Sequence, residues 1–324
     1  MTGARLPRCA HRLIVASLAV AGFACTSDPG YKGRSSAEWI GQLEHGTRDA
    51  RVDAAYALGH VLELQPNVRR VVRALSVAVR DTSDDVRIAA AGALRQAGER
   101  ARNAVPGIAE MLLDTAHANV RRTAAVLLGD LGRYDPSRAV PPLEQALFDK
   151  NPDVRIAVGS ALGRLGRDAG AATPRLIRAV ADPDANVRAQ AIDALSRVGL
   201  PHDTVAGVLQ LGLRDTVATV RIAAIQAIAR FVSDPRQLAP LLGASSTDRE
   251  PLVRLAVVNA LSVASDDSAH KLLQRAAKDF DQRVQQEALH MLSSAHRPGD
   301  THSMGEPSRS ERCLYAGARS TDKC

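Results

Sequence analysis

The chain has 324 residues, with 42 Lys and Arg against 35 Asp and Glu, and a formal net charge of +7. Aromatic residues make up only 3% of it, and its apolar 45% is mostly small and aliphatic, which favours closely packed helices over sheets. This apolar fraction excludes collagen-like and fully disordered chains, and no apolar run reaches the roughly 18 residues that a transmembrane helix needs.

Residues 1–24 have the layout of a secretory signal peptide. An apolar run of eleven residues, Leu13 to Phe23, follows the basic residues Arg5, Arg8 and Arg12. Such a run is too short to span a bilayer, and a short apolar run after a basic start is typical of a signal that is removed on export. Removal of residues 1–24 takes away three arginines and no acid, and leaves the mature chain with a net charge of +4.

The segment before Cys25 resembles the lipobox of bacterial lipoproteins, in which the cysteine is acylated and becomes the new N-terminus. Gly22 and Ala24 are the small residues of this resemblance, although lipoboxes favour Leu where Gly22 stands. The resemblance implies lipid attachment at Cys25, a tether over residues 25–34, and an outer-membrane or periplasmic location, because Thr26 is not acidic. Plain secretion with a free Cys25 and an uncleaved anchor stay open as alternatives.

A nine-residue pattern, VRIAAAGAL at Val86 to Leu94, recurs along the chain. Counted at its arginine position, copies start at positions 51, 87, 121, 155, 188, 221, 254 and 285, at intervals of 31 to 36 residues. Each copy has an apolar stripe of helical period. A second helical segment precedes each copy, and the prolines at 106, 141, 142, 174 and 240 are expected to start or bend it. The unit is therefore predicted to be a pair of helices.

Each unit also carries residues suited to the ends of helices. Glycines stand eleven residues after the arginine position, where a helix end favours a left-handed residue: Gly98, Gly132, Gly166 and Gly199. An aspartate in the turn before each copy can accept hydrogen bonds from the first N–H groups of the next helix. These aspartates are Asp81, Asp114, Asp149, Asp182, Asp215, Asp248 and Asp279.

The repeated arginines are expected to reach carboxylates or carbonyls of neighbouring turns. They are Arg87, Arg121, Arg155, Arg188, Arg221 and Arg254, with Arg51 in a degenerate first copy. Stacked units would then form an Asp ladder and an Arg ladder with a structural role. Residues 31–296 contain 34 basic and 30 acidic groups, a near balance that disfavours nucleic-acid binding.

Together, these positions resemble the HEAT-like repeats of the phycobilisome lyase group. The resemblance covers about Ser35 to Ala295, and it implies an all-α fold: an α-solenoid, a right-handed superhelix of about eight HEAT-like two-helix repeats over residues 35–295. The repeated residues are those that hold a stack together, so the resemblance implies little about activity. The only tryptophan, Trp39, is expected to close the N-terminal end, and the polar tail 296–324 is expected to be disordered.

The positions that vary from unit to unit predict where a partner binds. Second helices are expected to line the concave side, which repeat proteins offer to partners. Arg164, Arg197 and Arg230 occupy one such position in three consecutive units and are expected to form a basic strip, with Asp193, Gln226 and Asn259 beside it. We hypothesise that the strip receives an acidic protein segment or another anion. An ordinary solvated face is the alternative.

No motif in the chain indicates catalysis. It has no His-Glu pair, no His-x-x-x-His, no Gly-x-Ser-x-Gly and no phosphate-binding glycine-rich loop, so neither metal nor cofactor is expected. The predicted function is a non-catalytic scaffold or adaptor at the bacterial cell envelope, with a protein partner and with membrane contact through the lipid alone. A lyase-type enzyme or accessory subunit and a nucleic-acid-binding solenoid stay open as alternatives, as does pairing of Cys313 with Cys324.

Overall fold

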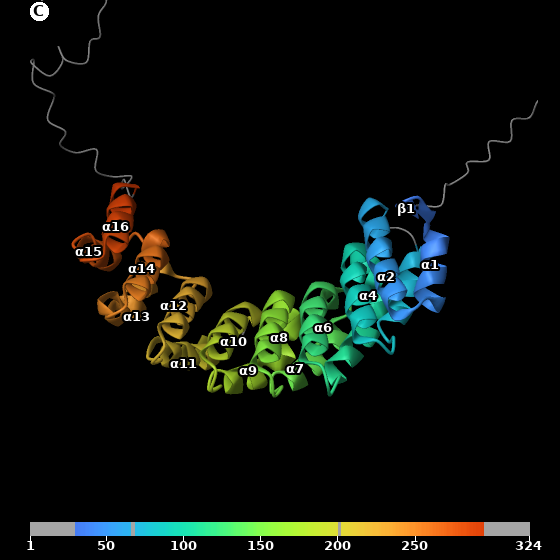
Figure 1. Ribbon diagram of the computed structural model, residues 1–324. Helices are drawn as coiled ribbons and strands as arrows, with labels where there is room; N and C mark the ends of the chain where they lie inside the picture. Colours follow the sequence, from blue (N-terminus) through green and yellow to red (C-terminus); the bar gives the residue numbers. More distant parts are fainter. Residues whose placement is uncertain (1–29, 66–68, 200–201, 295–324) are drawn as a thin grey trace, which may run out of the picture.

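The computed structural model describes residues 30–65, 69–199 and 202–294 of the chain. Nearly all of this part is helical, and its helices stack side by side into an open arc (Figure 1). The predicted all-α solenoid is therefore confirmed. The predicted signal peptide, Cys25 and the tail 296–324, with Cys313 and Cys324, lie outside the described residues. None of the described helices is long and apolar enough to cross a membrane.

The second helices of the repeats line the inside of the arc (Figure 1). Their buried side chains are mostly Ala, Val, Leu and Ile, at the positions that the apolar stripe predicts. These helices are α2 (Arg48–Leu64), α4 (Asp84–Leu94), α6 (Ala118–Leu131), α8 (Pro152–Leu165), α10 (Ala185–Val198), α12 (Ala218–Phe231), α14 (Pro251–Ala260) and α16 (Gln282–Ser294).

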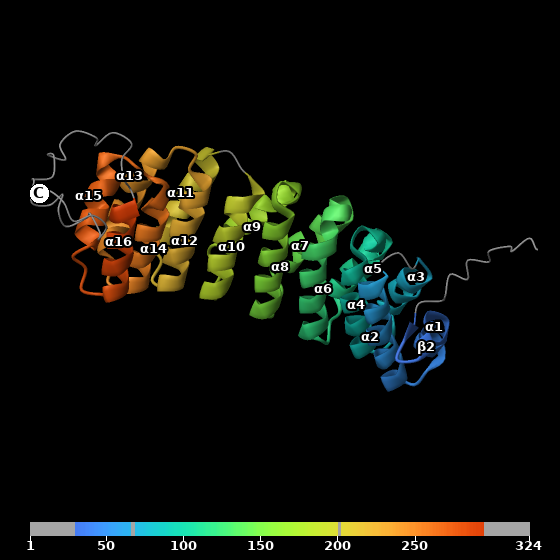
Figure 2. The ribbon, with the colours of Figure 1, turned by 90° about the horizontal axis from the view of Figure 1, so that it is seen from above.

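The first helices form the outer layer, and several of them are short (Figures 1 and 2). They are α1 (Ser36–His45), α3 (Arg69–Ala78), α5 (Val105–Glu110), α7 (Pro136–Ala146), α9 (Thr173–Ala179), α11 (His202–Leu213), α13 (Leu238–Leu242) and α15 (Asp267–Ala276). Turns of 3₁₀ helix extend or connect the helices: η1 (Arg95–Ala104), η2 (Met111–Leu113), η3 (Gly132–Tyr134), η4 (Gly166–Ala172), η5 (Pro235–Gln237), η6 (Gly243–Thr247) and η7 (Leu261–Val263). Pro106 and Pro174 stand in the first turns of α5 and α9, where proline is tolerated.

The N-terminal end of the stack is covered by a small hairpin that the repeat pattern did not predict. Strands β1 (Gly30–Tyr31) and β2 (Arg34–Ser35) pair antiparallel. Trp39 is 7% exposed, and its indole N–H donates to the carbonyl of Tyr31 at 3.0 Å. The Tyr31 ring stacks on the His60 ring of α2 at 4.7 Å between centroids. The hairpin and Trp39 together shield the first repeat from solvent.

The repeated glycines do not all have the conformation expected of them. Gly199 is left-handed helical, with φ 79° and ψ 53°, and Gly98 and Gly166 have positive φ of 55° and 57° with ψ near −128°, whereas Gly132 has φ −62° and is right-handed helical. A Cβ on Gly132 would lie 2.7 Å from the Cβ of Ala139. The expectation was therefore wrong at Gly132, where glycine allows close packing between the end of α6 and helix α7.

The C-terminal end of the stack leaves part of its apolar flank exposed in the described residues. Val258 in α14 is 2% exposed because the last repeat packs over it. Leu289, at the equivalent position of α16, is 52% exposed, because no further described repeat follows. The difference shows how much of each repeat's core depends on its neighbour.

Candidate functional site

The repeated arginines and aspartates form one continuous ladder along the turns between first and second helices. Nε and Nη2 of Arg121 donate to the two carboxylate oxygens of Asp149, in the next repeat, at 2.6 and 2.9 Å. The same two-bond geometry joins Arg51 to Asp81, Arg155 to Asp182, Arg188 to Asp215, Arg221 to Asp248, and Arg254 to Asp279. One hydrogen bond of 2.6 Å joins Arg87 to Asp114.

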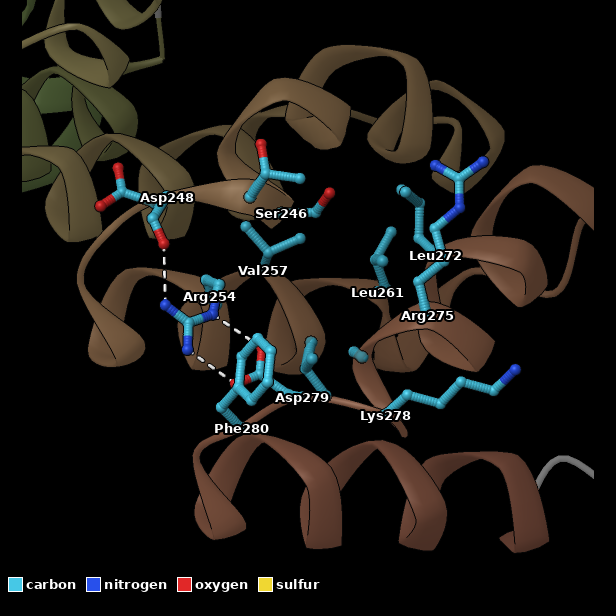
Figure 3. A pocket seen from close by; sticks show the side chains of 13 residues that line it. Ser246, Asp248, Arg254, Val257, Leu261, Leu272, Arg275, Lys278, Asp279 and Phe280 are labelled. Carbon is cyan, nitrogen blue, oxygen red and sulfur yellow. Dashed lines mark hydrogen bonds and ion pairs between the residues drawn. The ribbon is translucent and has the colours of Figure 1, made fainter.

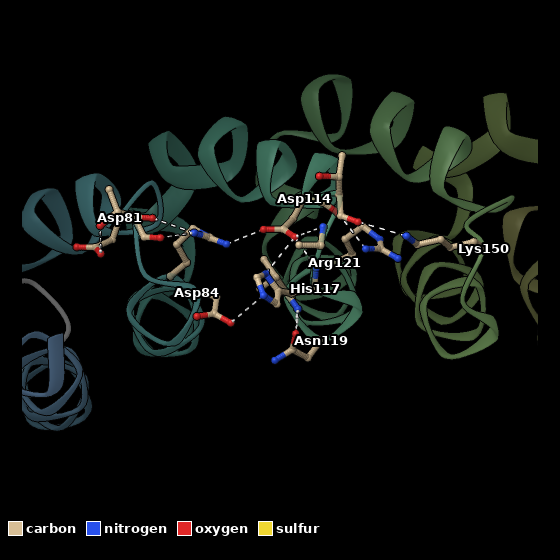
Figure 4. Close-up of polar contacts among 12 residues, drawn as sticks. Asp81, Asp84, Asp114, His117, Asn119, Arg121 and Lys150 are labelled. Atoms are coloured by element: carbon tan, nitrogen blue, oxygen red, sulfur yellow. Dashed lines mark hydrogen bonds and ion pairs between the residues drawn. The ribbon is translucent and has the colours of Figure 1, made fainter.

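Each ladder residue also binds the turn of its own repeat. Nη1 of Arg121 donates to the carbonyl of Asp114 at 2.9 Å (Figure 4). Asp149 accepts the backbone N–H of Asn151 at 2.8 Å. Arg121 is only 4% exposed. The other ladder side chains are likewise paired and at most 20% exposed, so they have few donors or acceptors left for a ligand, and their role is to join consecutive repeats.

The ladder lowers the pKa of its carboxylates. Hydrogen bonds from Arg188 hold the pKa of Asp215 below its ordinary value of 3.8, and they outweigh burial, which acts in the opposite direction. For Asp149, burial is the largest influence and raises the pKa, but the hydrogen bonds from Arg121 and from the N–H of Asn151 together lower it. The ladder therefore favours the ionised state of these aspartates.

One turn of the ladder contains an extra residue. Asp114 stands seven residues before its arginine, and its carboxylate accepts the backbone N–H groups of Ala116 and His117 at 3.0 and 2.7 Å. The His117 ring lies between two carboxylates, 3.5 Å from Asp114 and 3.8 Å from Asp84 (Figure 4). The insertion lengthens the turn without interrupting the ladder, because Asp114 still pairs with Arg87.

On the concave face, the arginines of the predicted strip contact the preceding repeat or their own helix. Arg164 of α8 donates from Nη2 to the carbonyl of Val126 in α6 at 2.9 Å and from Nη1 to the hydroxyl of Ser160 at 2.9 Å. Its Nε lies 3.3 Å from Asp130. Asp130 is a carboxylate that the sequence pattern did not single out as part of the strip.

Asp193 forms ion pairs with the other two arginines of the strip. Its carboxylate accepts from Nε of Arg197, one turn along α10, at 2.9 Å, and from Nη1 of Arg230 in α12 at 3.0 Å. Arg230 also donates to the hydroxyl of Ser196. The concave strip, defined as Asp130, Arg164, Asp193, Arg197 and Arg230, therefore alternates in charge and holds one more arginine than aspartate. This differs from the expected row of basic side chains.

Small residues in the preceding helix allow the strip arginines to lie flat. A Cβ on Gly129 would collide with the Arg164 guanidinium and lie 2.8 Å from the Cα of Ala161. A Cβ on Gly163 would lie 3.4 Å from Cδ of Arg197. Ser196 is the equivalent residue beneath Arg230. These small residues stand eight positions after each repeat arginine, and this spacing is a sequence signal that could have located the strip's contacts.

Gln226, Arg230 and Asn259 line one hollow between α12 and α14 on the concave face. Its volume is about 500 Å³, and its other lining residues are apolar: Ile222, Ala229, Leu252, Leu255, Ala256 and Ala260. Leu252 is 51% exposed. We call this hollow the α12–α14 groove. The structure thus brings together three of the six residues predicted to bind a partner, around an apolar floor that was not predicted, and places Arg164 two repeats away.

Comparison with known proteins assigns the repeat to a family. The HEAT-repeat family matches residues 105–196, 166–229 and 205–293, which together make up more than half of the chain. This chain belongs to the HEAT-repeat family. This match confirms the HEAT repeats predicted from the sequence. The more specific resemblance to the phycobilisome lyase group stays a prediction. No curated protein matches the chain significantly.

Solved structures share the fold of this HEAT-repeat protein at low identity. YibA of Escherichia coli is 21% identical over 80% of this chain and 93% of its own, with a TM-score of 0.54. An engineered protein is 20% identical over 79% and 77%, with a TM-score of 0.50. A chain in the structure of the complex of CpcE and CpcF of phycocyanin lyase, from Nostoc sp. PCC7120, is 22% identical over 82% of this chain and 97% of its own, and its TM-score of 0.44 is too low for any functional conclusion.

A second hollow of this HEAT-repeat protein lies beside the ladder. It has a volume of about 350 Å³ and opens between η6 and α15, where Ser246, Val257, Leu261 and Leu272 face one another (Figure 3). One wall is the Arg254–Asp279 pair of the ladder. Among the described residues, no group of three or more His, Cys, Asp and Glu could hold a metal ion.

Proposed function

We propose that this protein is a non-catalytic scaffold that holds a protein partner on the concave face of its solenoid. HEAT repeats generally mediate protein interactions, and stacked second helices offer an extended concave surface for this purpose. The observation that carries the proposal is the α12–α14 groove. Its lining combines six apolar residues with three polar side chains, and protein-binding surfaces commonly have such a mixed composition.

The chemistry of the groove supports a particular kind of partner segment. Leu252 and Leu255 would receive an apolar side chain, and its burial would supply most of the free energy of binding. The amides of Gln226 and Asn259 can both donate and accept hydrogen bonds, so they suit the backbone of an extended or helical segment. Arg230 stands at the same groove and suits a carboxylate.

The charge of the concave strip supports a partner with acidic residues. Asp193 serves two arginines, and the side chains of Arg197 and Arg230 are 47% and 38% exposed. Their remaining N–H groups face solvent and would attract a carboxylate next to the apolar side chain in the groove. We therefore propose that the partner presents an apolar residue flanked by Asp or Glu.

We further propose that the scaffold acts at the bacterial cell envelope, through a lipid on Cys25. The support for this location is the signal-like sequence of residues 1–24 and the lipobox-like Gly22 to Cys25. Growth with an alkyne-labelled fatty acid tests it. The wild-type protein should incorporate the label and a Cys25→Ser variant should not. Equal labelling of the two would contradict lipid attachment at this residue.

Affinity capture from an envelope extract tests the proposed partner site. A Leu252→Asp variant places a charge on the exposed floor of the groove and should lose the partner that the wild type retains. The matched control is Val263→Asp, because Val263 is also exposed and apolar, at 63%, and lies outside the groove in the same repeat. Loss in both variants, or in neither, would contradict the groove as the site. Mass spectrometry of the retained protein then shows whether it carries acidic segments.

A further inference from the structure

The two edges of the solenoid differ in charge over the first four repeats. One edge holds the ladder turns, residues 46–51, 79–87, 113–121 and 147–155, which contain seven basic and seven acidic side chains. The other edge holds the connections that lead from each second helix to the next repeat. The described residues of these connections include eight arginines and three carboxylates. The arginines are Arg69, Arg70, Arg95, Arg100, Arg102, Arg133, Arg138 and Arg167, and the carboxylates are Glu99, Asp135 and Asp168. We call this second edge the arginine edge.

The charge of the arginine edge is exposed and only partly compensated. All eight arginines are exposed. Arg102 and Arg138 lie 3.8 and 3.5 Å from the carboxylate of Asp135, and Arg95 lies 3.9 Å from that of Asp130 in the concave strip. Within the part of the chain that the structure describes, Arg100 and Arg167 have no ion-pair partner, and Arg133 donates to the hydroxyl of Tyr134. Such guanidinium groups suit phosphate, which accepts two parallel hydrogen bonds from one arginine.

The charge is confined to the N-terminal half of the solenoid. The equivalent connection after α12 holds one arginine and one aspartate, Arg236 and Asp234, which pair with each other at 3.0 Å. The connection after α14 holds Asp266 and Asp267 and no basic residue. The excess of positive charge is therefore a property of repeats one to four rather than of the repeat pattern.

The hairpin through which the chain enters the solenoid lies near this edge. The Tyr31 ring stacks on His60, in the last turns of α2, where α2 leads into the connection before Arg69. Only residues 26–29 separate Cys25 from the hairpin, and an extended chain spans at most about 3.5 Å per residue. A lipid on Cys25 would thus keep the first repeat within about 20 Å of a bilayer, with the arginine edge close to it.

We infer that the arginine edge docks on a bilayer that contains anionic phospholipid and so orients the scaffold at the membrane. This inference rests on the proposed envelope location. Leu64, the last residue of α2, is 74% exposed beside the edge, and an exposed leucine favours a lipid interface over a nucleic acid. A lipid chain and a basic patch together bind a membrane far more firmly than one chain alone.

Flotation with vesicles tests the inference, using the full chain with Cys25→Ser so that no acyl group contributes. Vesicles of 30% phosphatidylglycerol in phosphatidylcholine are compared with pure phosphatidylcholine at about 0.1 M salt. An Arg100/Arg133/Arg167→Gln variant removes three charges from the edge. Each basic residue near an anionic surface contributes about a 5-fold factor, so the preference for anionic vesicles should fall by about 100-fold.

The control variant, Arg236/Arg249/Arg283→Gln, removes the same charge from the last three repeats and should bind as the wild type does. Its arginines pair with Asp234, Glu250 and Asp281. Equal losses in both variants, or none in the edge variant, would overturn the inference. Tighter binding of the wild type to a 20-base-pair DNA duplex than to anionic vesicles would overturn it in favour of a nucleic acid. Partner capture depends on Leu252 instead, so failure of the two proposals can be told apart.

Discussion

Two rows of arginine–aspartate contacts run along this solenoid, and they differ in how far water reaches them. In the ladder, the side chains of Arg121 and Asp149 are 4% and 10% exposed. In the concave strip, those of Arg230 and Asp193 are 38% and 29% exposed. Breaking a buried pair leaves an uncompensated charge, whereas pairs open to water contribute little stability. The same residue types thus join repeats in the ladder, whereas in the concave strip they leave N–H donors exposed to solvent, where we propose that a partner binds.

The largest effect is expected from breaking the ladder. Asp215→Ala leaves Arg188 without its carboxylate and should lower the free energy of unfolding by about 3 kcal/mol, measured by urea denaturation. Asp234→Ala is the control, because the Asp234–Arg236 pair lies within one exposed turn. A similar loss in both variants would show that the ladder is no stronger than a surface pair.

Acid should weaken the ladder without any substitution. The pKa of Asp215 lies below 3.8 in the folded chain and is ordinary in the unfolded chain, so between these values the unfolded chain binds more protons. The stabilisation is complete above about pH 4 and is lost as the pH falls through the folded pKa. Urea midpoints measured from pH 7 to pH 2.5 should decline below about pH 4, and less steeply in Asp215→Asn. Identical slopes for the two proteins would contradict this expectation.

Two glycine-to-alanine substitutions should distinguish the effect of packing against the strip arginines from the effect of helix propensity on stability. In Gly129→Ala the new methyl meets Arg164 and the backbone of Ala161, and overpacking of this kind costs about 1–3 kcal/mol. Gly92→Ala has no atom within 4 Å of the new methyl, and it should instead gain about 0.5–1 kcal/mol of helix stability. Urea denaturation of both variants checks the opposite signs. Equal signs would show that Arg164 does not depend on Gly129.

The smallest effect on stability is expected within the strip itself. Arg197→Gln removes an exposed pair one turn apart on α10 and should change the free energy of unfolding by less than about 0.5 kcal/mol. The same change should weaken partner capture if the strip binds an acidic segment. Unchanged capture with unchanged stability would leave the strip as an ordinary solvated face.

Much of the fold could be predicted because the same residue pattern occurs in eight copies along the chain. A valine, an arginine and small residues recur at one spacing, so the apolar stripe and the ladder follow from the pattern. Gly132 was misjudged because a glycine at a helix end serves either a left-handed turn or a close approach, and only the position of Ala139 decides between them. The hairpin was missed because its strands have two residues each.

The direction of the strip arginines was harder to predict than their position. Helical periodicity places Arg164, Arg197 and Arg230 on one face, but a long flexible side chain can extend into solvent or lie along its neighbour. The small residues Gly129, Gly163 and Ser196 leave room for the arginine side chains to lie along the preceding helix. Asp130 and Asp193 supply partners for the guanidinium groups. The groove likewise needs α12 and α14 side by side, which no single repeat specifies.

The residue pattern alone was enough to establish the helical repeat, its apolar stripe and the residues of the ladder, because each depends on contacts that recur at constant spacing. Tertiary structure decided which carboxylate neutralises which arginine, where the concave face becomes hollow, and that basic charge collects on one edge of the first four repeats. These features depend on contacts between residues about thirty positions apart, in neighbouring repeats. At that separation, sequence spacing determines which position of the repeat a residue occupies, but it does not determine the direction in which its side chain extends.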